Sequence, residues 1–332
     1  MINFLSEQKI LSPVFLAPLA GITDLPYRNL VNSFGAGLVV SEIVASKELV
    51  VGGKSAIARA NIGLNVENTS VQISGSDPLV MAECARICED NGARVIDINM
   101  GCPAKKVING YAGSALMQDI TAATKIINHV VNAVKVPVTL KTRLGWNEKE
   151  LNAPKLCMIA EDLGIQLVTI HGRTRCQFFK GSADWERINE TVDALKIPVI
   201  ANGDITDINS AKIALNLSGA AGIMIGRGVG GKPWLLAEIS HALFNTTRPQ
   251  IPNNKSFCEM IVLHYEAALR FYGDALGVRS FRKHINWYLS YLDIIDAEIR
   301  REILTEENPS LVISMIQSLF DLEYSNELKK VS

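Results

Sequence analysis

The stretch VIDINMGCPAKKVINGYAGSALMQDITAATKIINHVVNAVKVPVTLK, residues 95–141, decides the fold class because it contains two kinds of regular pattern. Its ends, 95–99 and 136–141, are short runs rich in β-branched residues. Between them, apolar residues recur at steps of three and four from Leu116 to Val134, which places them on one face of a helix. We therefore expect a strand, a helix and a second strand that runs parallel to the first.

The same alternation of strand-like and helix-like segments recurs through the first two thirds of the chain. Eight runs are predicted to form strands: Val14–Ala17, Leu38–Glu42, Val71–Ser74, Val95–Asn99, Val136–Lys141, Leu167–His171, Pro198–Ala201 and Gly222–Ile225. Eight strand–helix units with short connections predict an α/β fold that closes into a (β/α)8 TIM barrel. An open, doubly wound sheet is the alternative architecture.

The last third of the chain has a different pattern. From residue 255 onward the periodicity is helical only, and the preceding joint NTTRPQIPNNK, residues 245–255, is polar and rich in Pro and Asn. We expect a catalytic barrel over residues 1–240 and a small all-helical domain over residues 250–332.

Composition limits the environment and the partners of the protein. Lys and Arg number 33 against 34 Asp and Glu, so the net charge of −1 gives no general attraction to a polyanion. The six cysteines are scattered and show no metal-binding spacing, which favours a reduced protein without a metal ion. Two prolines interrupt the apolar stretch ILSPVFLAPLAGI, residues 10–22, and no basic segment precedes it. We therefore expect a cytoplasmic protein with no membrane partner.

Polar and glycine residues follow nearly every predicted strand. In a TIM barrel these positions meet at the C-terminal end of the strands, where active sites are found. Each one alone could be a turn or capping residue, but their coincidence at successive strands predicts a site. They are Pro18-Leu19-Ala20-Gly21, Glu42, Gln72, Asn99 with Cys102, Lys141 with Arg143, His171 with Arg173, Asn202-Gly203-Asp204 and Gly226-Arg227-Gly228.

The ends of the last two strands favour a phosphate site. The segments IANGDI, residues 200–205, and IMIGRGVGG, residues 223–231, offer glycine backbone N–H groups, and Arg227 adds a cation. GRGVGG also fits the dinucleotide pattern G-x-G-x-x-G, but it follows the last strand and has no acidic residue at the required distance. We interpret it as a phosphate-binding loop.

Cys102 lies between Gly101 and Pro103 in the loop after a predicted strand. A free cysteine is most often a small buried hydrophobic residue. A thiol that is not activated is mostly protonated at neutral pH, so Cys102 could instead donate a proton as a general acid. A thiolate nucleophile is the third interpretation, and it requires a neighbouring histidine or helix N-terminus.

Seven short motifs occur in this order along the chain: APLAG, VQISG, DINMGCPAKKV, LKTRLGW, TIHGRT, IANGDI and IGRG followed by GKPW. In them the chain resembles the bacterial tRNA-dihydrouridine synthase family, most closely its B-type branch. It departs from the usual pattern at Leu19, where methionine is frequent, and at Gly228, where alanine is frequent. Neither departure removes a functional group.

The resemblance implies an FMN-containing barrel that reduces the C5=C6 bond of selected uridines in tRNA and uses NADPH to reduce the flavin again. Hydride would pass from flavin N5 to uracil C6, and Cys102 would give its proton to C5. Asn99 and Arg143 would bond the uracil edge. Lys141, with His171 close by, would lie near the electron-rich edge of the flavin. The remaining implied cofactor residues are Pro18, Leu19, Ala20 and Gln72 at the flavin ring, and Asn202, Gly203, Asp204, Gly226 and Arg227 at the ribityl and phosphate end.

A uridine must leave the RNA stack to reach such a cavity, so the RNA backbone needs contacts of its own. Lys105 and Lys106 follow the Cys102 loop and are candidates. In GVRSFRKHINWYL, residues 277–289, Arg279, Arg282 and Lys283 share one arc of a predicted helix, opposite apolar residues. A merely solvated helix face is the alternative. We expect tRNA as the partner of a monomeric protein.

Three other functions remain open from the sequence. One is an FMN barrel that acts on a small molecule, such as a dihydroorotate-type dehydrogenase. Another is a Schiff-base aldolase in which Lys141 supplies the amine. The last is an RNA-binding module without catalysis, since a barrel fold alone distinguishes none of these.

Overall fold

The structure is a computed structural model that describes residues 3–61, 63, 68–292 and 296–331. The side chains of Asn3, of Lys106 and of residues 321–331 lie outside this description. The chain divides into two compact units, residues 1–228 with 235–248 and residues 229–234 with 249–332.

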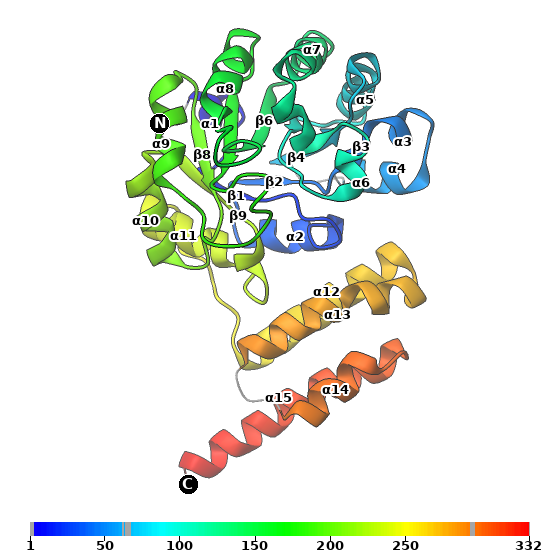
Figure 1. The fold of residues 1–332 in the computed structure, drawn as a ribbon. Helices are drawn as coiled ribbons and strands as arrows, with labels where there is room; N and C mark the ends of the chain where they lie inside the picture. Colours follow the sequence, from blue (N-terminus) through cyan, green and yellow to red (C-terminus); the bar gives the residue numbers. More distant parts are fainter. Residues whose placement is uncertain (1–2, 62, 64–67, 293–295, 332) are drawn as a thin grey trace. The chain divides into compact units, whose positions relative to one another are not determined.

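The first unit is built around a closed ring of parallel strands (Figure 1). Its members are β1 (Val14–Leu16), β2 (Leu38–Val40), β4 (Thr69–Ser74), β5 (Val95–Asn99), β6 (Val138–Arg143), β7 (Leu167–His171), β8 (Val199–Asn202) and β9 (Gly222–Ile225). β1 pairs with both β2 and β9, so that Phe15 lies opposite Leu38 and Met224. The ring is closed because β2 also pairs with β4. The two-residue strand β3 (Val44–Ala45) pairs with β4 outside this ring. The predicted TIM barrel is confirmed, and the open sheet is wrong.

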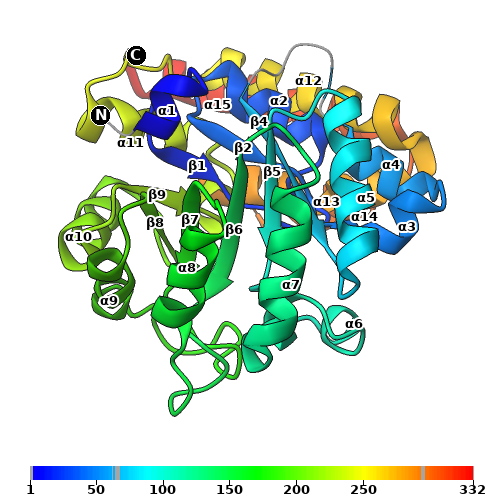
Figure 2. The ribbon, with the colours of Figure 1, turned by 90° about the horizontal axis from the view of Figure 1, so that it is seen from above.

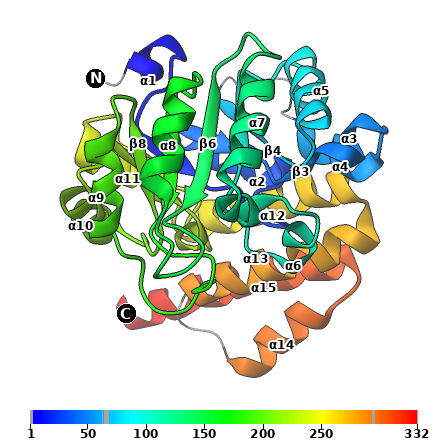
Figure 3. The ribbon, with the colours of Figure 1, turned by 45° about the horizontal axis from the view of Figure 1, so that its top comes forward.

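Helices follow the strands and cover the barrel from outside, as Figure 2 shows for α5, α7, α8 and α9. The helices of this unit are α1 (Asn3–Glu7), α2 (Leu25–Ser33), α3 (Ser46–Val50), α4 (Lys54–Ala60), α5 (Pro78–Asp90), α6 (Lys105–Ile108), α7 (Ile120–Val131), α8 (Ala153–Asp162), α9 (Glu186–Ala194), α10 (Ile208–Ser218) and α11 (Leu235–Phe244). Short 3-10 helices are η1 (Gly113–Gln118) and η2 (Arg227–Val229). The same strand–helix layering is visible in Figure 3.

Local sequence signals explain where several helices begin and end. The side chain of Asp77 accepts hydrogen bonds from the N–H groups of Leu79 and Val80 at the start of α5. The side chain of Asp207 caps α10 through the N–H of Ser210, and Gly219, with a φ of 64°, caps the C-terminus of that helix. The predicted continuous helix from Leu116 is interrupted, because Asp119 caps a new helix through the N–H of Ala122 and leaves 113–118 as the 3-10 turn η1.

An apolar plug fills the N-terminal end of the barrel. Phe4, Leu5 and Ile10 from the first ten residues pack into one buried cluster with Phe15, Ala17, Leu38, Val40, Val95, Leu167, Ile200 and Met224. This plug closes one end of the barrel, so any cavity must open at the other end, where the strands finish in the polar residues identified above.

The second unit consists of helices α12 (Asn254–Tyr272), α13 (Asp274–Tyr291), α14 (Ala297–Thr305) and α15 (Pro309–Val331). Helices α12 and α13 join at Gly273, whose φ of 76° reverses the chain. Phe257 of α12 contacts the aromatic rings of Trp234, Tyr288 and Phe320, so segment 229–234 packs with this unit. Among the helices of the described residues, none is long and apolar enough to cross a membrane.

Candidate functional site

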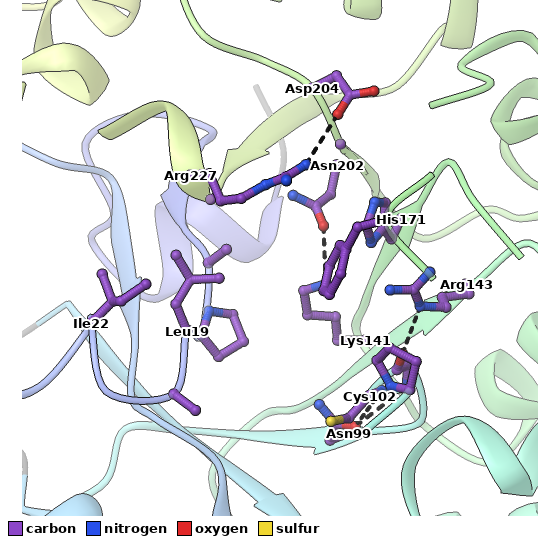
Figure 4. A pocket seen from close by; sticks show the side chains of 18 of the residues that line it. Leu19, Ile22, Asn99, Cys102, Lys141, Arg143, His171, Asn202, Asp204 and Arg227 are labelled. Carbon is purple, nitrogen blue, oxygen red and sulfur yellow. Dashed lines mark hydrogen bonds and ion pairs between the residues drawn. The ribbon is translucent and has the colours of Figure 1, made fainter. Parts of the chain in front are cut away.

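A cavity of about 610 Å³ opens at the C-terminal end of the barrel strands. It is lined by side chains and glycines from the ends of β1, β5, β6, β7, β8 and β9. In Figure 4, Lys141, Arg143, His171 and Cys102 lie on one side, and Leu19 and Ile22 lie across the cavity from them. The predicted site residues that the cavity brings together are Pro18, Leu19, Ala20, Asn99, Cys102, Lys141, Arg143, His171, Asn202, Gly203, Asp204, Gly226 and Arg227.

Lys141 is a buried lysine held in one position. Its Nζ donates to Oδ1 of Asn202 at 3.0 Å, and Nδ2 of Asn202 donates to the carbonyl of Met224 at 2.8 Å. Burial lowers the pKa of Lys141 to about 8; the Asp97 carboxylate opposes this effect, and the Arg143 cation adds to it. Lys141 is therefore a fixed positive charge at neutral pH, close to its titration range.

Arg143 joins two loops above the barrel. Its Nε donates to the carbonyl of Gly101 at 2.8 Å, and its Nη1 donates to the carbonyls of Thr174 and Phe178 at 2.9 and 2.8 Å. Burial lowers the pKa of Arg143 to about 10, so the guanidinium remains charged at neutral pH. Arg143 thus ties the loop that carries Cys102 to the loop after β7.

His171 is a neutral imidazole of defined tautomer. Its Nε2 lies 3.3 Å from Nη1 of Arg173, and because arginine can only donate, Nε2 accepts and the proton lies on Nδ1. The pKa of His171 is far below its ordinary value because of burial and, next, the charges of Arg143 and Lys141. At neutral pH His171 therefore adds a hydrogen-bond donor to this part of the barrel and no charge.

An ion pair fixes the loop after β8. Both terminal nitrogens of the Arg173 guanidinium donate to the Asp204 carboxylate, Nη1 to Oδ1 at 3.0 Å and Nη2 to Oδ2 at 2.5 Å. Burial alone would raise the pKa of Asp204, but hydrogen bonds from Arg173 and from the N–H of Ala183 hold it below its ordinary value. Gly203 and Asp204 have φ values of 120° and 53°, so the chain turns sharply here. Arg227 is 3.6 Å from the same carboxylate, and its side chain is 62% exposed.

The turn that carries Cys102 is held from both sides. Oδ1 of Asn99 accepts from the N–H groups of Gly101 and Cys102 at 3.3 and 3.0 Å. The N–H and Oγ of Ser114 both donate to the carbonyl of Cys102, at 3.1 and 2.9 Å. Gly113 has a φ of 61°, and a Cβ there would lie 2.8 Å from the Cys102 oxygen. Of the six cysteines, Cys102 lines the cavity, whereas Cys84, Cys88, Cys157 and Cys258 are buried elsewhere and Cys176 is exposed.

Gln72 does not line the cavity but forms part of a hydrogen-bond chain beneath it. Its Nε2 donates to Oδ2 of Asp97 at 2.6 Å, and its Oε1 accepts from Nδ2 of Asn99 at 2.8 Å. Thr139 donates to the other oxygen of Asp97 at 2.5 Å. Burial raises the pKa of Asp97, and the bonds from Gln72 and Thr139 and the charge of Lys141 oppose that rise.

Sequence reasoning missed Asp97, although the signal was present. Side chains alternate along a strand, so Asp97 points to the same face of β5 as Asn99. A carboxylate two residues before a predicted site residue, within a strand, is unusual enough to be noted.

The aromatic pair Phe178 and Phe179 in the loop after β7 was also missed. Both line the cavity, and they are 43% and 47% exposed. The ring of Phe179 has two guanidinium carbons close to its centre, that of Arg143 at 5.6 Å and that of Arg227 at 5.3 Å. The dipeptide lies in no periodic segment, and only the two adjacent aromatic residues in a polar loop could have drawn attention to it.

Lys105, predicted to contact the RNA backbone, is not among the residues that line the cavity. Lys105 is exposed at the start of α6, and the side chain of Lys106 falls outside the described residues. In the second unit, Arg279 is exposed on α13, and its Nε donates to the carbonyl of Ala275. Arg282 reaches the carbonyl of Thr305 at 3.5 Å and Glu307 at 3.9 Å, and Lys283 is half-buried.

The cavity combines an apolar side with a side rich in cations and hydrogen-bond donors. Within the described residues no group of three or more His, Cys, Asp or Glu side chains could hold a metal ion. The arrangement suits a ligand with a flat apolar face and an anionic end, next to a thiol that can donate a proton.

Comparison with known proteins identifies the relatives of this chain. The family model described as "Dihydrouridine synthase (Dus)" matches residues 15–313. A protein of Rhodobacter capsulatus named "Probable tRNA-dihydrouridine synthase" is 50% identical over 309 residues, which cover 93% of this chain and 94% of that one. A Rickettsia bellii protein of the same name is 48% identical over 93% of this chain and 95% of its own length. The "tRNA-dihydrouridine synthase B" of Vibrio parahaemolyticus is 44% identical over 93% and 95% of the two chains.

Proposed function

The chain belongs to the dihydrouridine synthase family, and from this we propose that it is a tRNA-dihydrouridine synthase, a flavin-dependent oxidoreductase. The proposed reaction reduces the C5=C6 bond of specific uridines in tRNA to 5,6-dihydrouridine, with bound FMN as cofactor and NADPH as reductant. The observation that carries the proposal is the position of Cys102, which lines the same cavity as Lys141, Arg143 and Arg227.

The lining residues fit FMN. Pro18, Leu19 and Ala20 give an apolar surface for a flat ring system. Gly226 is open to the cavity, because a Cβ there would meet only Leu19 and Ala17 side chains, at 3.7 Å or more. Glycine backbone at this point, beside the cationic Arg227, suits the phosphate end of the cofactor.

The other proposed cofactor contacts are residues that the family resemblance implied. Asn202, Gly203 and Asp204 line the cavity, where Asn202 bonds Lys141 and Asp204 pairs with Arg227, and we assign them to the ribityl and phosphate end. Gln72 is fully buried and bonded to Asp97 and Asn99, so its contact with the flavin ring stays a prediction.

When bound, FMN would supply the hydride that uracil receives at C6, and NADPH would restore the reduced cofactor. Lys141 would hold its positive charge against the electron-rich edge of the ring, fixed there by Asn202. His171, with its proton on Nδ1, would offer a neutral donor in the same region.

Cys102 would complete the reduction by donating the proton of Sγ to C5 of the uracil ring. Asn99 and Ser114 hold the backbone of Cys102 in place, and the position of a general acid affects rate strongly. Asn99 and Arg143 would bond the uracil carbonyls, because Nδ2 of Asn99 and the guanidinium of Arg143 are donors and both residues line the cavity.

The tRNA would be held outside the cavity while the target base is extruded into it. Exposed Lys105 is proposed to contact the RNA backbone, together with Lys106. In the helical unit we assign the same role to Arg279, Arg282 and Lys283. Arg279 is the most exposed of the three, whereas Arg282 also contacts Glu307.

The test is nucleoside mass spectrometry of an unmodified tRNA transcript after incubation with the purified protein, FMN and NADPH. The proposal expects a uridine heavier by two hydrogens, and no reduced product from free uridine or orotate under the same conditions. Turnover of the free pyrimidine with untouched tRNA would instead favour a small-molecule reductase. Borohydride trapping of a carbonyl substrate on Lys141 would favour a Schiff-base enzyme.

A further inference from the structure

Asp97 is a buried acid that the proposed reaction leaves without a role. Its side chain is 3% exposed and does not line the cavity. It lies between Gln72 and Thr139, which are its register partners on β4 and β6. Both of these residues donate hydrogen bonds to its carboxylate.

The direction of the hydrogen bonds from Asp97 to Cys102 is fixed at both ends. The backbone N–H groups of Gly101 and Cys102 can only donate, so the Asn99 amide must turn its oxygen to them and its NH2 to Gln72. Gln72 then accepts with its oxygen and turns its own NH2 to Asp97. Reversal of either amide would place two donors or two acceptors at hydrogen-bond distance inside the barrel, which is costly because water cannot replace the lost bonds.

We propose that Asp97 is a positioning residue that orients the Asn99 amide through Gln72. The proposal rests on the proposed function for its substrate. In this orientation the oxygen of Asn99 holds the Cys102 turn, and the second N–H of its Nδ2 is the group that Asn99 can offer to a uracil carbonyl. Asp97 thereby acts on the Cys102 turn and on the Asn99 NH2 group that faces uracil, through Gln72 and not by a direct hydrogen bond.

Three variants separate this role from general packing. Asp97→Leu keeps the branched shape of the side chain and removes the acceptor. Asp97→Asn can turn its oxygen to Gln72 and its NH2 to the hydroxyl of Thr139, so it restores the chain of bonds. Thr139→Val is the matched control, because it removes the bond to the other Asp97 oxygen and leaves the path to Asn99 intact.

Two measurements on flavin-loaded protein report the effect. The first is the rate at which iodoacetamide alkylates Cys102, followed by mass spectrometry relative to the exposed Cys176 as internal reference. The second is the single-turnover rate of uridine reduction in tRNA by NADPH-reduced enzyme. In Asp97→Leu we expect Cys102 to react with iodoacetamide at least about threefold faster and uridine to be reduced about tenfold more slowly. Both changes follow because the Asn99 amide is no longer oriented and holds the Cys102 turn less firmly. Asp97→Asn should keep the alkylation rate within about twofold of wild type, whereas its uridine reduction also loses the carboxylate charge that raises the pKa of Lys141. Thr139→Val should stay within about twofold of wild type in both measurements.

Unchanged rates in flavin-loaded Asp97→Leu would overturn the proposal, and so would an equal effect of Thr139→Val. If Asp97→Leu does not fold, Gln72→Glu takes its place. A glutamate at position 72 replaces the NH2 that donates to Asp97 by a carboxylate oxygen, so two acceptors face each other. Adding Asp97→Asn should then recover the Cys102 alkylation rate, and a failure to recover it in folded protein would contradict the proposal. Wild-type protein that reduces no uridine would refute the proposed function, whereas Cys102 alkylation would still test Asp97.

Discussion

Replacement of Lys141 by methionine should make the flavin-free protein more stable at neutral pH while weakening its function. Burial lowers the pKa of Lys141 from 10.5 to about 8 in the folded chain, and this value already includes the favourable charge of Asp97. Each pH unit corresponds to ~1.4 kcal/mol, so holding the ammonium in the barrel costs about 3 kcal/mol at pH 7. The lost hydrogen bond to Asn202 offsets about 1 kcal/mol of that gain, which leaves a net stabilisation of about 2 kcal/mol.

The pH dependence gives this prediction its sign. The folded pKa of Lys141 lies below the unfolded one, so between about pH 8 and 10.5 the unfolded chain binds more protons and stability rises with pH. The penalty is complete below pH 8 and is lost as the pH approaches 10.5. The advantage of Lys141→Met should therefore be largest at pH 7 and nearly absent at pH 10.

Urea unfolding of flavin-free wild type and Lys141→Met, followed by circular dichroism at pH 7, 8, 9 and 10, measures the difference. Lys149→Met, which replaces an exposed lysine, is the matched control and should change the free energy of unfolding by less than about 0.5 kcal/mol. The same Lys141→Met protein should bind FMN more weakly. A variant that is less stable than wild type at pH 7, or a difference that does not shrink with rising pH, would refute the reasoning.

Two further predictions concern the acid turn and the RNA. Gly113→Ala should slow uridine reduction by about tenfold or more, because the left-handed backbone and a Cβ only 2.8 Å from the Cys102 oxygen force the turn to move. Single-turnover kinetics with flavin content as the control would show it, and an unchanged rate would mean that the turn tolerates displacement. The double variant Arg279→Ala, Arg282→Ala should weaken tRNA binding. It should also reduce the slope of the logarithm of the binding constant against the logarithm of salt concentration by the equivalent of about one to two phosphate contacts. Filter binding at several salt concentrations would reveal this, and a salt slope equal to that of wild type would remove α13 from the interface.

The barrel could be predicted because each strand carries its own signal. Runs such as 95–99 and 167–171 end in polar residues at the point where the structure ends β5 and β7. The helix predicted from Leu116 was too long at its start. Apolar periodicity indicates which face of a helix is buried, but it does not show that the helix begins after Asp119, which caps it.

The cavity was predictable as a set of strand ends, but its internal connections were not. The sequence places Gln72 at such an end, yet the pairing of β4 with β5 directs its amide to Asp97 and Asn99 rather than to the cavity. Likewise the position of Phe179 depends on Arg143, which bonds the carbonyl of Phe178 from a different strand. Such contacts depend on register and loop closure, and no local pattern encodes them.

The central claim, that Cys102 is the acid of a uridine reductase, is tested most directly by comparing wild type with Cys102→Ala, both loaded with FMN. The measurement is nucleoside mass spectrometry of an unmodified tRNA after NADPH is added, with NADPH oxidation followed in the same samples. The account predicts dihydrouridine from wild type, and a variant that still binds FMN and oxidises NADPH but loses most of that product. Equal product from Cys102→Ala, or loss of FMN from that variant, would contradict it.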